Sequence, residues 1–135
     1  MNRLEGRVAT ITGGGSGLGK ATAIRFASEG AHVVIADLDE KNGQAVASEV
    51  NGTFIKCNVT DKDSVDNMFA ETFKKFGKID IAFNNAGISP PDDDSILTTE
   101  RDAWDKVLLV NLTSVYLCCK AVLPYMLEAK KGSII

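Results

Sequence analysis

The feature that most constrains this chain is an apolar segment that ends in a run of glycines and then turns helical. Val8–Ile11 is apolar, Thr12–Gly19 is glycine-rich, and good helix formers follow. This order indicates a buried strand, a tight turn and the start of a helix. Backbone N–H groups at a helix start are unpaired and lie at the positive end of the helix dipole, so they bind anions. The segment therefore predicts a phosphate-binding turn.

A second apolar segment, His32–Ala36, ends at Asp37. The distance from the glycine turn to this acid is close to the ~20 residues that separate a phosphate-binding turn from a ribose-binding carboxylate. Turn and acid together predict a dinucleotide site. An Asp at a strand end is also typical of a capped turn, and that interpretation of Asp37 stays open.

Other glycine motifs fit this segment less well. The pattern G-x-G-x-x-G fails in every register. The phosphate-loop pattern of nucleotide triphosphatases matches from Gly14 to Gly19-Lys20, but Ala21 stands where a hydroxyl must reach Mg²⁺. A glycine turn that only packs a helix on a sheet is the third alternative.

The spacing that does fit, Thr12-Gly13-x-x-x-Gly17-x-Gly19, resembles the short-chain dehydrogenases/reductases. Asn84-Asn85-Ala86-Gly87 and Asn111 stand where this family carries further motifs, and the resemblance extends over all 135 residues. It implies an oxidoreductase that transfers hydride between a nicotinamide cofactor and an alcohol or ketone.

The elements alternate along the chain. Strands are expected at Arg7–Thr12, His32–Asp37, Thr53–Cys57 and Ile79–Asn84, and helices at Gly17–Glu29, Glu40–Val50 and Lys62–Phe76. A loop with an acidic triplet follows, then an amphipathic segment with Trp104, a long helix from about Asn111 to Ala129 and a strand from Gly132. This alternation predicts one α/β domain over residues 1–135, a doubly wound parallel sheet (Rossmann fold) in the order 3-2-1-4-5.

The last residues, Ile134-Ile135, read as part of a buried strand, so we expect a fold truncated after the fifth strand. In the resembled family the catalytic serine and Tyr-x-x-x-Lys pair lie beyond this point. Tyr116 and Lys120 have the spacing of that pair. They lie in the long helix, before the strand that should precede the family's serine, so we do not assign them the catalytic role. We expect the cofactor-binding half of an enzyme, inactive alone. A truncated NAD-binding module that regulates or associates is the alternative.

The resemblance also implies roles for individual residues around the dinucleotide. The turn residues are expected to contact the pyrophosphate, and they are Gly13, Ser16, Gly17, Leu18 and Gly19. Asp37 is expected to bind the ribose, and the absence of a cation at Leu38 and Ser16 favours NAD over NADP.

Further residues are assigned to the adenine and the middle of the cofactor. Asn58-Val59 stands where the family has Asp-Val beside the adenine, and the Asn58 amide oxygen is expected to accept from the adenine amino group. Asn85, Ala86 and Gly87, with Asn84, are expected to line the middle of the cofactor, unless the Asn pair serves the turn. Asn111 is expected to break its helix and hold a water for proton transfer, or to be an N-cap.

Composition excludes several classes of partner. A net charge of -3 does not suit nucleic acid, no apolar run approaches the ~20 residues of a membrane span, and the first residues lack a secretory signal, so a cytoplasmic protein is expected. Three cysteines without metal spacing are expected to be reduced, and no metal is predicted. An apolar stripe, Val115, Cys119, Val122 and Met126, predicts a homo-oligomer through the helix of residues 111–129.

Overall fold

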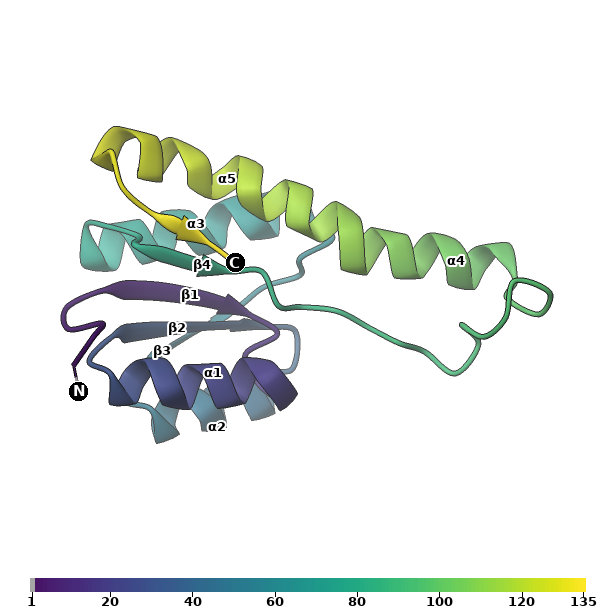
Figure 1. Ribbon diagram of the computed structural model, residues 1–135, viewed down its shortest axis with the longest axis horizontal. Helices are drawn as coiled ribbons and strands as arrows, with labels where there is room; N and C mark the ends of the chain where they lie inside the picture. Colours follow the sequence, from purple (N-terminus) through teal and green to yellow (C-terminus); the bar gives the residue numbers. More distant parts are fainter. Residues whose placement is uncertain (1) are drawn as a thin grey trace.

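The computed structural model describes residues 2–135, which form a parallel sheet between two layers of helices (Figure 1). The strands are β1 (Val8–Thr12), β2 (His32–Asp37), β3 (Thr53–Lys56), β4 (Ile81–Phe83) and β5 (Ser133–Ile134). The helices are α1 (Gly17–Ser28), α2 (Glu40–Glu49), α3 (Lys62–Phe76), α4 (Arg101–Leu108), the π-turn η1 (Leu109–Thr113) and α5 (Ser114–Ala129). The strand order is β3-β2-β1-β4-β5 with every pairing parallel, which confirms the predicted topology.

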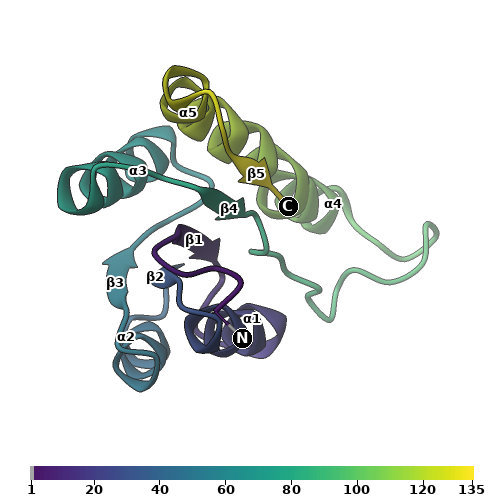
Figure 2. The same cartoon turned by 60° about the vertical axis from the view of Figure 1, so that its left-hand side comes forward.

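The sheet is apolar on both sides because helices cover both of its faces. All five residues of β1 are buried, and β2 is buried from Val33 to Ala36. One layer, α1 and α2, packs on Ile11, Val33 and Ile35, and the other, α3 and α5, packs on the opposite face (Figures 1 and 2). The second core is the larger one and includes Val34, Val65, Met68, Phe69, Val122 and Met126.

Capping residues set the bounds of the surface helices. The carboxylates of Asp39 and Asp61 accept backbone N–H bonds at the starts of α2 and α3. Gly77, with φ 71°, ends α3 in the left-handed conformation that suits glycine. The predicted bounds of the strands and helices from β1 to β4 agree with the structure within two residues. The largest difference is β4, which is shorter at both ends than the predicted Ile79–Asn84.

The helix before β5 differs most from the prediction. It runs without interruption from Arg101 to Ala129, so it begins well before Asn111. Asn111 lies inside the π-turn rather than at a helix start, and the N-cap interpretation is therefore wrong. No glycine or proline separates the amphipathic segment from the long helix, so nothing in the backbone ends the first before the second begins.

The predicted apolar stripe on this helix does not form an exposed surface. Of its four residues, Val122 and Met126 are buried against α3 and the sheet, and Val115 and Cys119 are half-buried. The exposed face carries other apolar side chains: Trp104, Leu108, Leu109, Leu112, Tyr116, Leu123 and Leu127.

By length and composition, the helix of 29 residues from Arg101 to Ala129 could also cross a membrane. This finding differs from the prediction that no apolar run approaches the ~20 residues of a membrane span. The buried face described above gives the helix a second reason to be apolar, because it supplies part of the core.

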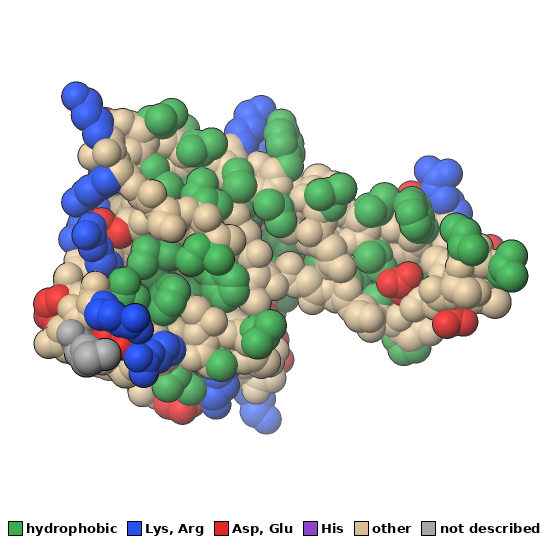
Figure 3. Space-filling model, viewed as in Figure 1, with side chains coloured by type: hydrophobic (Ala, Val, Ile, Leu, Met, Phe, Trp, Pro, Cys, Tyr) green, Lys and Arg blue, Asp and Glu red, His purple; other side chains and the backbone are tan. Residues whose placement is uncertain are grey.

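The segment between β4 and α4 extends away from the sheet and forms an arm with the start of α4 (Figures 1 and 2). Ile96 and Leu97 at this arm are 85% and 93% exposed. Figure 3 shows apolar side chains along the arm and along the neighbouring helix. Exposed apolar side chains therefore extend from the arm along the helix, and others, such as Leu18 and Leu38, lie elsewhere.

Candidate cofactor site

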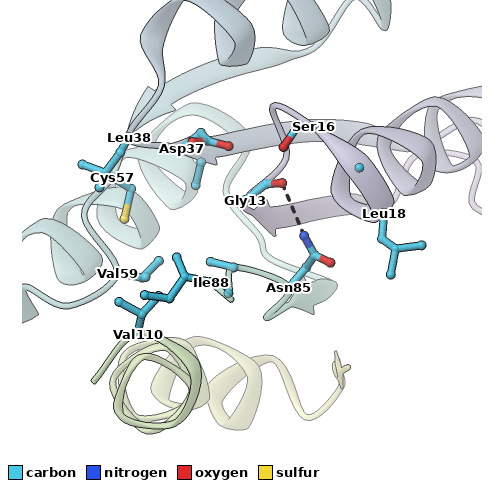
Figure 4. Close-up of a pocket in the computed structure, with 14 residues that line it drawn as sticks. Gly13, Ser16, Leu18, Asp37, Leu38, Cys57, Val59, Asn85, Ile88 and Val110 are labelled. Carbon is cyan, nitrogen blue, oxygen red and sulfur yellow. Dashed lines mark hydrogen bonds between the residues drawn. The ribbon is translucent and has the colours of Figure 1, made fainter. Parts of the chain in front are cut away.

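A cleft of about 390 Å³ opens where β1, β2 and β4 end (Figure 4). This edge is where ligands bind in doubly wound sheets. All of the predicted cofactor contacts line it except Gly19, Asn58 and Asn84. The full lining is Gly13, Ser16, Gly17, Leu18, Ala36, Asp37, Leu38, Cys57, Val59, Asn85, Ala86, Gly87, Ile88 and Val110.

The glycine turn delivers free N–H groups to this cleft. Gly13 and Gly17 have φ of 64° and 53°, which other residues rarely adopt. The first backbone bond of α1 runs from Lys20 to Ser16, and within residues 2–135 the N–H groups of Gly17, Leu18 and Gly19 have no acceptor. The first turn of α1 contains no acidic residue. The turn can therefore hold an anion such as a pyrophosphate.

Gly19 does not line the cleft, and its role is close packing. A Cβ on Gly19 would collide with the carbonyl oxygen of Gly13 and would lie 2.7 Å from the Asn85 amide nitrogen. Only glycine lets α1 start this close to the end of β1.

Thr12 and Asn85 lock the turn to the end of β4. The Thr12 hydroxyl accepts from the backbone N–H groups of Asn85 and Ala86, at 3.0 and 3.1 Å. The Asn85 amide donates to the carbonyl oxygens of Thr12 and Gly13, at 3.1 and 3.3 Å. Asn85 therefore both borders the cleft and serves turn structure, so the two interpretations of the Asn pair hold together. Its neighbour Asn84 instead donates to the Cys119 sulfur at 3.5 Å.

Asp37 lies beside the glycine turn at the end of β2. Its Oδ2 accepts from the Gly15 N–H at 2.9 Å, and its Oδ1 accepts from the Asp39 N–H at 3.0 Å. A Cβ on Gly15 would lie 2.9 Å from Oδ2, so glycine is needed there too. Each carboxylate oxygen can accept a further bond, and ribose hydroxyls are suitable donors. The capping interpretation of Asp37 is therefore compatible with ribose binding.

One end of the cleft is apolar, and sequence reasoning missed part of it. Leu38, Cys57 and Val59 lie together on the side of Asp37 away from Gly13 and Ser16 (Figure 4). Burial raises the pKa of the Cys57 thiol, which keeps it a neutral apolar wall. Four lining residues were not predicted: Ala36, Cys57, Ile88 and Val110. Ala36 and Cys57 lie where β2 and β3 end. Because ligands bind at the carboxyl ends of parallel strands, the sequence could have indicated both residues.

Asn58 lies between Cys57 and Val59 but its side chain serves its own turn. Its Oδ1 accepts from the Thr60 N–H at 3.0 Å and from the Thr60 hydroxyl at 2.7 Å. The oxygen that was expected to meet the adenine amino group is thus already occupied. A contact between Asn58 and the cofactor stays a prediction, but a different atom would make it.

Asn111 also lies outside the cleft lining and holds the loop that borders it. Its Nδ2 donates to the Ile88 carbonyl at 2.8 Å, and its Oδ1 accepts from the Ile88 N–H at 2.7 Å. The helix is not broken at Asn111, but its hydrogen bonding changes there: in the π-turn the Ser114 N–H donates to the Leu109 carbonyl. The role of Asn111 in holding a water stays a prediction.

Tyr116 and Lys120 are close to each other on α5. The Lys120 ammonium donates to the Tyr116 hydroxyl at 3.2 Å, and Tyr116 is 58% exposed on α5. Neither residue lines the cleft.

The fold and cleft agree with comparisons to known proteins. The model of the short chain dehydrogenase family matches residues 7–135, and the chain belongs to this family. It is 44% identical to secoisolariciresinol dehydrogenase of Forsythia intermedia, covering 98% of this chain and 49% of that protein. It is 39% identical to the 3-oxoacyl-[acyl-carrier-protein] reductase FabG of Thermotoga maritima, covering 98% of this chain and 55% of that protein.

A solved structure shows the same arrangement. Levodione reductase superimposes with a TM-score of 0.91 at 35% identity, covering 98% of this chain and 54% of that one. The chain spans about half the length of these relatives. The chain is therefore part of a family of oxidoreductases.

Proposed function

We propose that this chain is the cofactor-binding half of an NAD-dependent oxidoreductase that moves hydride between nicotinamide and an alcohol or ketone. The observation that carries the proposal is the position of Asp37 beside the free N–H groups of the glycine turn. The Asp37 carboxylate suits a ribose diol, the N–H groups of the turn suit a pyrophosphate, and both border the same cleft.

Bound NAD would supply the hydride acceptor, and the described residues would place it. Gly17 and Leu18 would hold the pyrophosphate by backbone N–H groups, and Asp37 would hold the ribose. Gly87 and Ile88 would border the middle of the cofactor, because the Asn111 amide fixes the Ile88 backbone. These contacts bind and orient the dinucleotide but transfer no proton.

We further propose that these 135 residues alone do not turn over an alcohol or ketone. The residue pair with the spacing of the family's catalytic pair, Tyr116 and Lys120, is on the exposed face of α5 instead of in the cleft. The polar side chains of the cleft lining are Ser16, Asp37, Cys57 and Asn85, and they include no tyrosine and no lysine.

The cofactor preference tests Asp37. We expect calorimetric titration of the 135-residue protein to show NAD binding about tenfold or more tightly than NADP, because a 2′-phosphate would face the Asp37 carboxylate. The Asp37→Ala variant should narrow this ratio toward one. The exposed carboxylate of Asp66 on α3 provides a control, since Asp66→Ala makes the same charge change outside the cleft. Equal affinities in the unchanged protein would remove Asp37 from its proposed role.

The exposed face of the long helix supports the proposed homo-oligomer. Successive four-residue steps drift around an α-helix by ~40° each. The π-turn has more residues per turn than the α-helix, so each of its residues rotates less and the drift is offset. The row on α4 therefore continues on the same face of α5. The row comprises Trp104, Leu108, Leu112, Tyr116, Leu123 and Leu127.

The row is nearly symmetric about the point between Val115 and Tyr116. An antiparallel copy centred there would place Trp104 beside Leu127 of its partner, Leu108 beside Leu123 and Leu112 beside the half-buried Cys119. A two-fold interface requires such self-complementarity. We therefore propose a dimer through this face in place of the stripe expected from the sequence.

Light scattering tests the dimer. We expect the protein to scatter as a dimer at micromolar concentration and the Leu112→Glu variant to scatter as a monomer, because Leu112 is 64% exposed at the centre of the row. Lys74→Glu, an exposed change on α3, should leave the dimer intact. A monodisperse monomer in the unchanged protein would contradict the proposal.

We propose the cytoplasm as the location, with neither membrane nor nucleic acid as partner. All three cysteines, Cys57, Cys118 and Cys119, are free, as thiols are in a reducing compartment. Protein contacts across the exposed row would account for the apolar character that the helix shares with a membrane span.

A further inference from the structure

The arm between β4 and α4 contains an ordered turn that presents two aliphatic side chains. Ile96 and Leu97 are almost fully exposed, whereas the polar residues around them bond to one another. The Asp94 carboxylate accepts from the Thr98 hydroxyl, and the Asp94 N–H donates to the Thr99 hydroxyl, both at 2.9 Å. A segment that is ordered in advance loses less entropy when it docks. The arm therefore suits insertion of Ile96 and Leu97 into an apolar groove.

Such a groove, of about 610 Å³, lies where α5 ends and β5 begins. Its apolar side chains come from both elements and two lysines follow the helix end; the residues are Leu123, Met126, Leu127, Ile134, Lys130 and Lys131. Leu123 and Leu127 also belong to the exposed row of the proposed dimer. The groove is therefore continuous with that interface.

The antiparallel dimer brings the arm of one copy to the groove of the other. Figure 1 shows the arm and the end of α5 at opposite ends of the long helix, as an antiparallel copy requires. With Trp104 beside the partner's Leu127, the residues before Trp104 approach the partner's residues that follow Leu127. Glu100 then lies beside the partner's Lys131, and the arm directly precedes Glu100.

The charges of the arm and of the groove are opposite. Asp92 and Asp93 lie on the arm, and within residues 2–135 their carboxylates have no hydrogen-bond or ion-pair partner. In the same described residues the exposed ammonium of Lys130, beside the groove, also has none. Arg101 would face the partner's Lys130, but it is already paired with Asp105 at 2.8 Å. The arm carboxylates can therefore serve as the counter-charges of the groove.

We propose that Ile96 and Leu97 of each copy dock in the apolar groove of the other copy. The inference rests on the proposed dimer and adds a second contact to it. A two-fold axis makes the two arm contacts identical, so each dimer contains two docked arms. Asp92 and Asp93 of each arm then face Lys130 of the other copy.

The dimer dissociation constant, measured by analytical ultracentrifugation, tests the apolar part of this contact. Leu97→Ser should raise the constant about a hundredfold, because each dimer loses two buried leucine side chains. The fold of the single chain should persist, since Leu97 is exposed there. Leu38→Ser is the matched control, because it makes the same change at an exposed leucine outside the arm and the groove. It should leave the constant unchanged.

A second experiment exchanges charges between copies. The double variant Asp92→Lys, Asp93→Lys places positive charge at both the arm and the groove, and Lys130→Glu places negative charge at both. Each variant alone should dimerise about tenfold more weakly. An equimolar mixture of the two should recover the affinity of the unchanged protein, because each arm in the mixed dimer again faces a groove of opposite charge.

The control mixture replaces Lys130→Glu by Lys74→Glu, which makes the same charge change on α3 and should not restore the affinity of the double variant. Equal recovery in both mixtures would overturn the inference, because general attraction between the chains would explain it. A dissociation constant unchanged in Leu97→Ser, with Leu112→Glu monomeric, would overturn the inference and leave the proposed dimer standing. A monomer in the unchanged protein would overturn both.

Discussion

The Gly19→Ala variant is expected to lose dinucleotide binding by about a hundredfold or more. Its Cβ would collide with the Gly13 carbonyl and press on the Asn85 amide nitrogen, 2.7 Å away. Relief requires α1 to move from the end of β1 or the Asn85 bonds to Thr12 and Gly13 to break. Either change displaces the N–H groups of Gly17 and Leu18 that the pyrophosphate needs.

Calorimetric titration with NAD measures this loss, and circular dichroism shows whether the fold persists. Gly17→Ala is the informative comparison. Gly17 has φ 53°, but a Cβ added there would meet nothing within 4 Å, so the variant carries only a conformational cost of about 1 kcal/mol. A smaller loss for Gly19→Ala than for Gly17→Ala would contradict the packing role of Gly19.

The fold could be predicted from the sequence because its strands are buried on both faces and its turns carry their own signals. β2 and α3 have the predicted bounds, Gly77 ends α3, and the strand order follows from the handedness of the crossovers. The sequence analysis predicted a separate long helix from about Asn111, whereas residues 101–129 form one continuous helix. Its π-turn contains Asn111, whose amide binds the Ile88 backbone, and a contact between such distant residues is not recorded in a local pattern.

The apolar stripe on the same helix shows a second limit. Helical spacing predicts that apolar residues share a face, but does not say which of two apolar faces the sheet will cover. Val122 and Met126 point to the core, while Leu123 and Leu127, one position along, are exposed. A helix that is apolar on most sides leaves this choice to tertiary packing.

The parts of the site that a backbone motif creates could be predicted from the sequence. The parts that depend on which hydrogen bonds a side chain already makes within the protein were predicted less well. The glycine turn and Asp37 lie together as expected, because parallel strands bring their carboxyl ends to one edge. The acceptor role expected of Asn58 is one that Thr60 already uses. Spacing identifies a residue at a site, but the partners of each atom require the structure.

Asp80 anchors the opposite edge of the sheet. Its carboxylate is 3% exposed and accepts from the Val8 N–H at 2.9 Å and from Arg7 at 3.2 Å, with Lys78 and Lys131 at 3.5 and 3.8 Å. Burial would raise the pKa of Asp80, but the Val8 N–H bond and these cations outweigh it and the pKa is lowered. The charged form therefore joins the starts of β1 and β4 to the approach to β5.

The Asp80→Ala variant is expected to lower the free energy of unfolding by about 2–4 kcal/mol, because it leaves the buried Val8 N–H without its side-chain acceptor. Asp80→Asn, which can keep that bond but not the charge, should cost less. Urea unfolding followed by circular dichroism at about pH 7 measures both. Asp105→Ala, which breaks an exposed pair with Arg101, should cost about 0.5 kcal/mol or less.

The same comparison repeated at lower pH separates the charge of Asp80 from its packing. Because the folded pKa is below the unfolded value of about 3.9, the charge stabilises the fold fully above that value. This stabilisation is lost as the pH falls through the folded pKa. The difference between the unchanged protein and Asp80→Asn should therefore be constant from about pH 7 to about pH 5 and shrink toward pH 3. A difference that stays constant down to pH 3 would show that the carboxylate acts through shape and hydrogen bonding rather than through its charge.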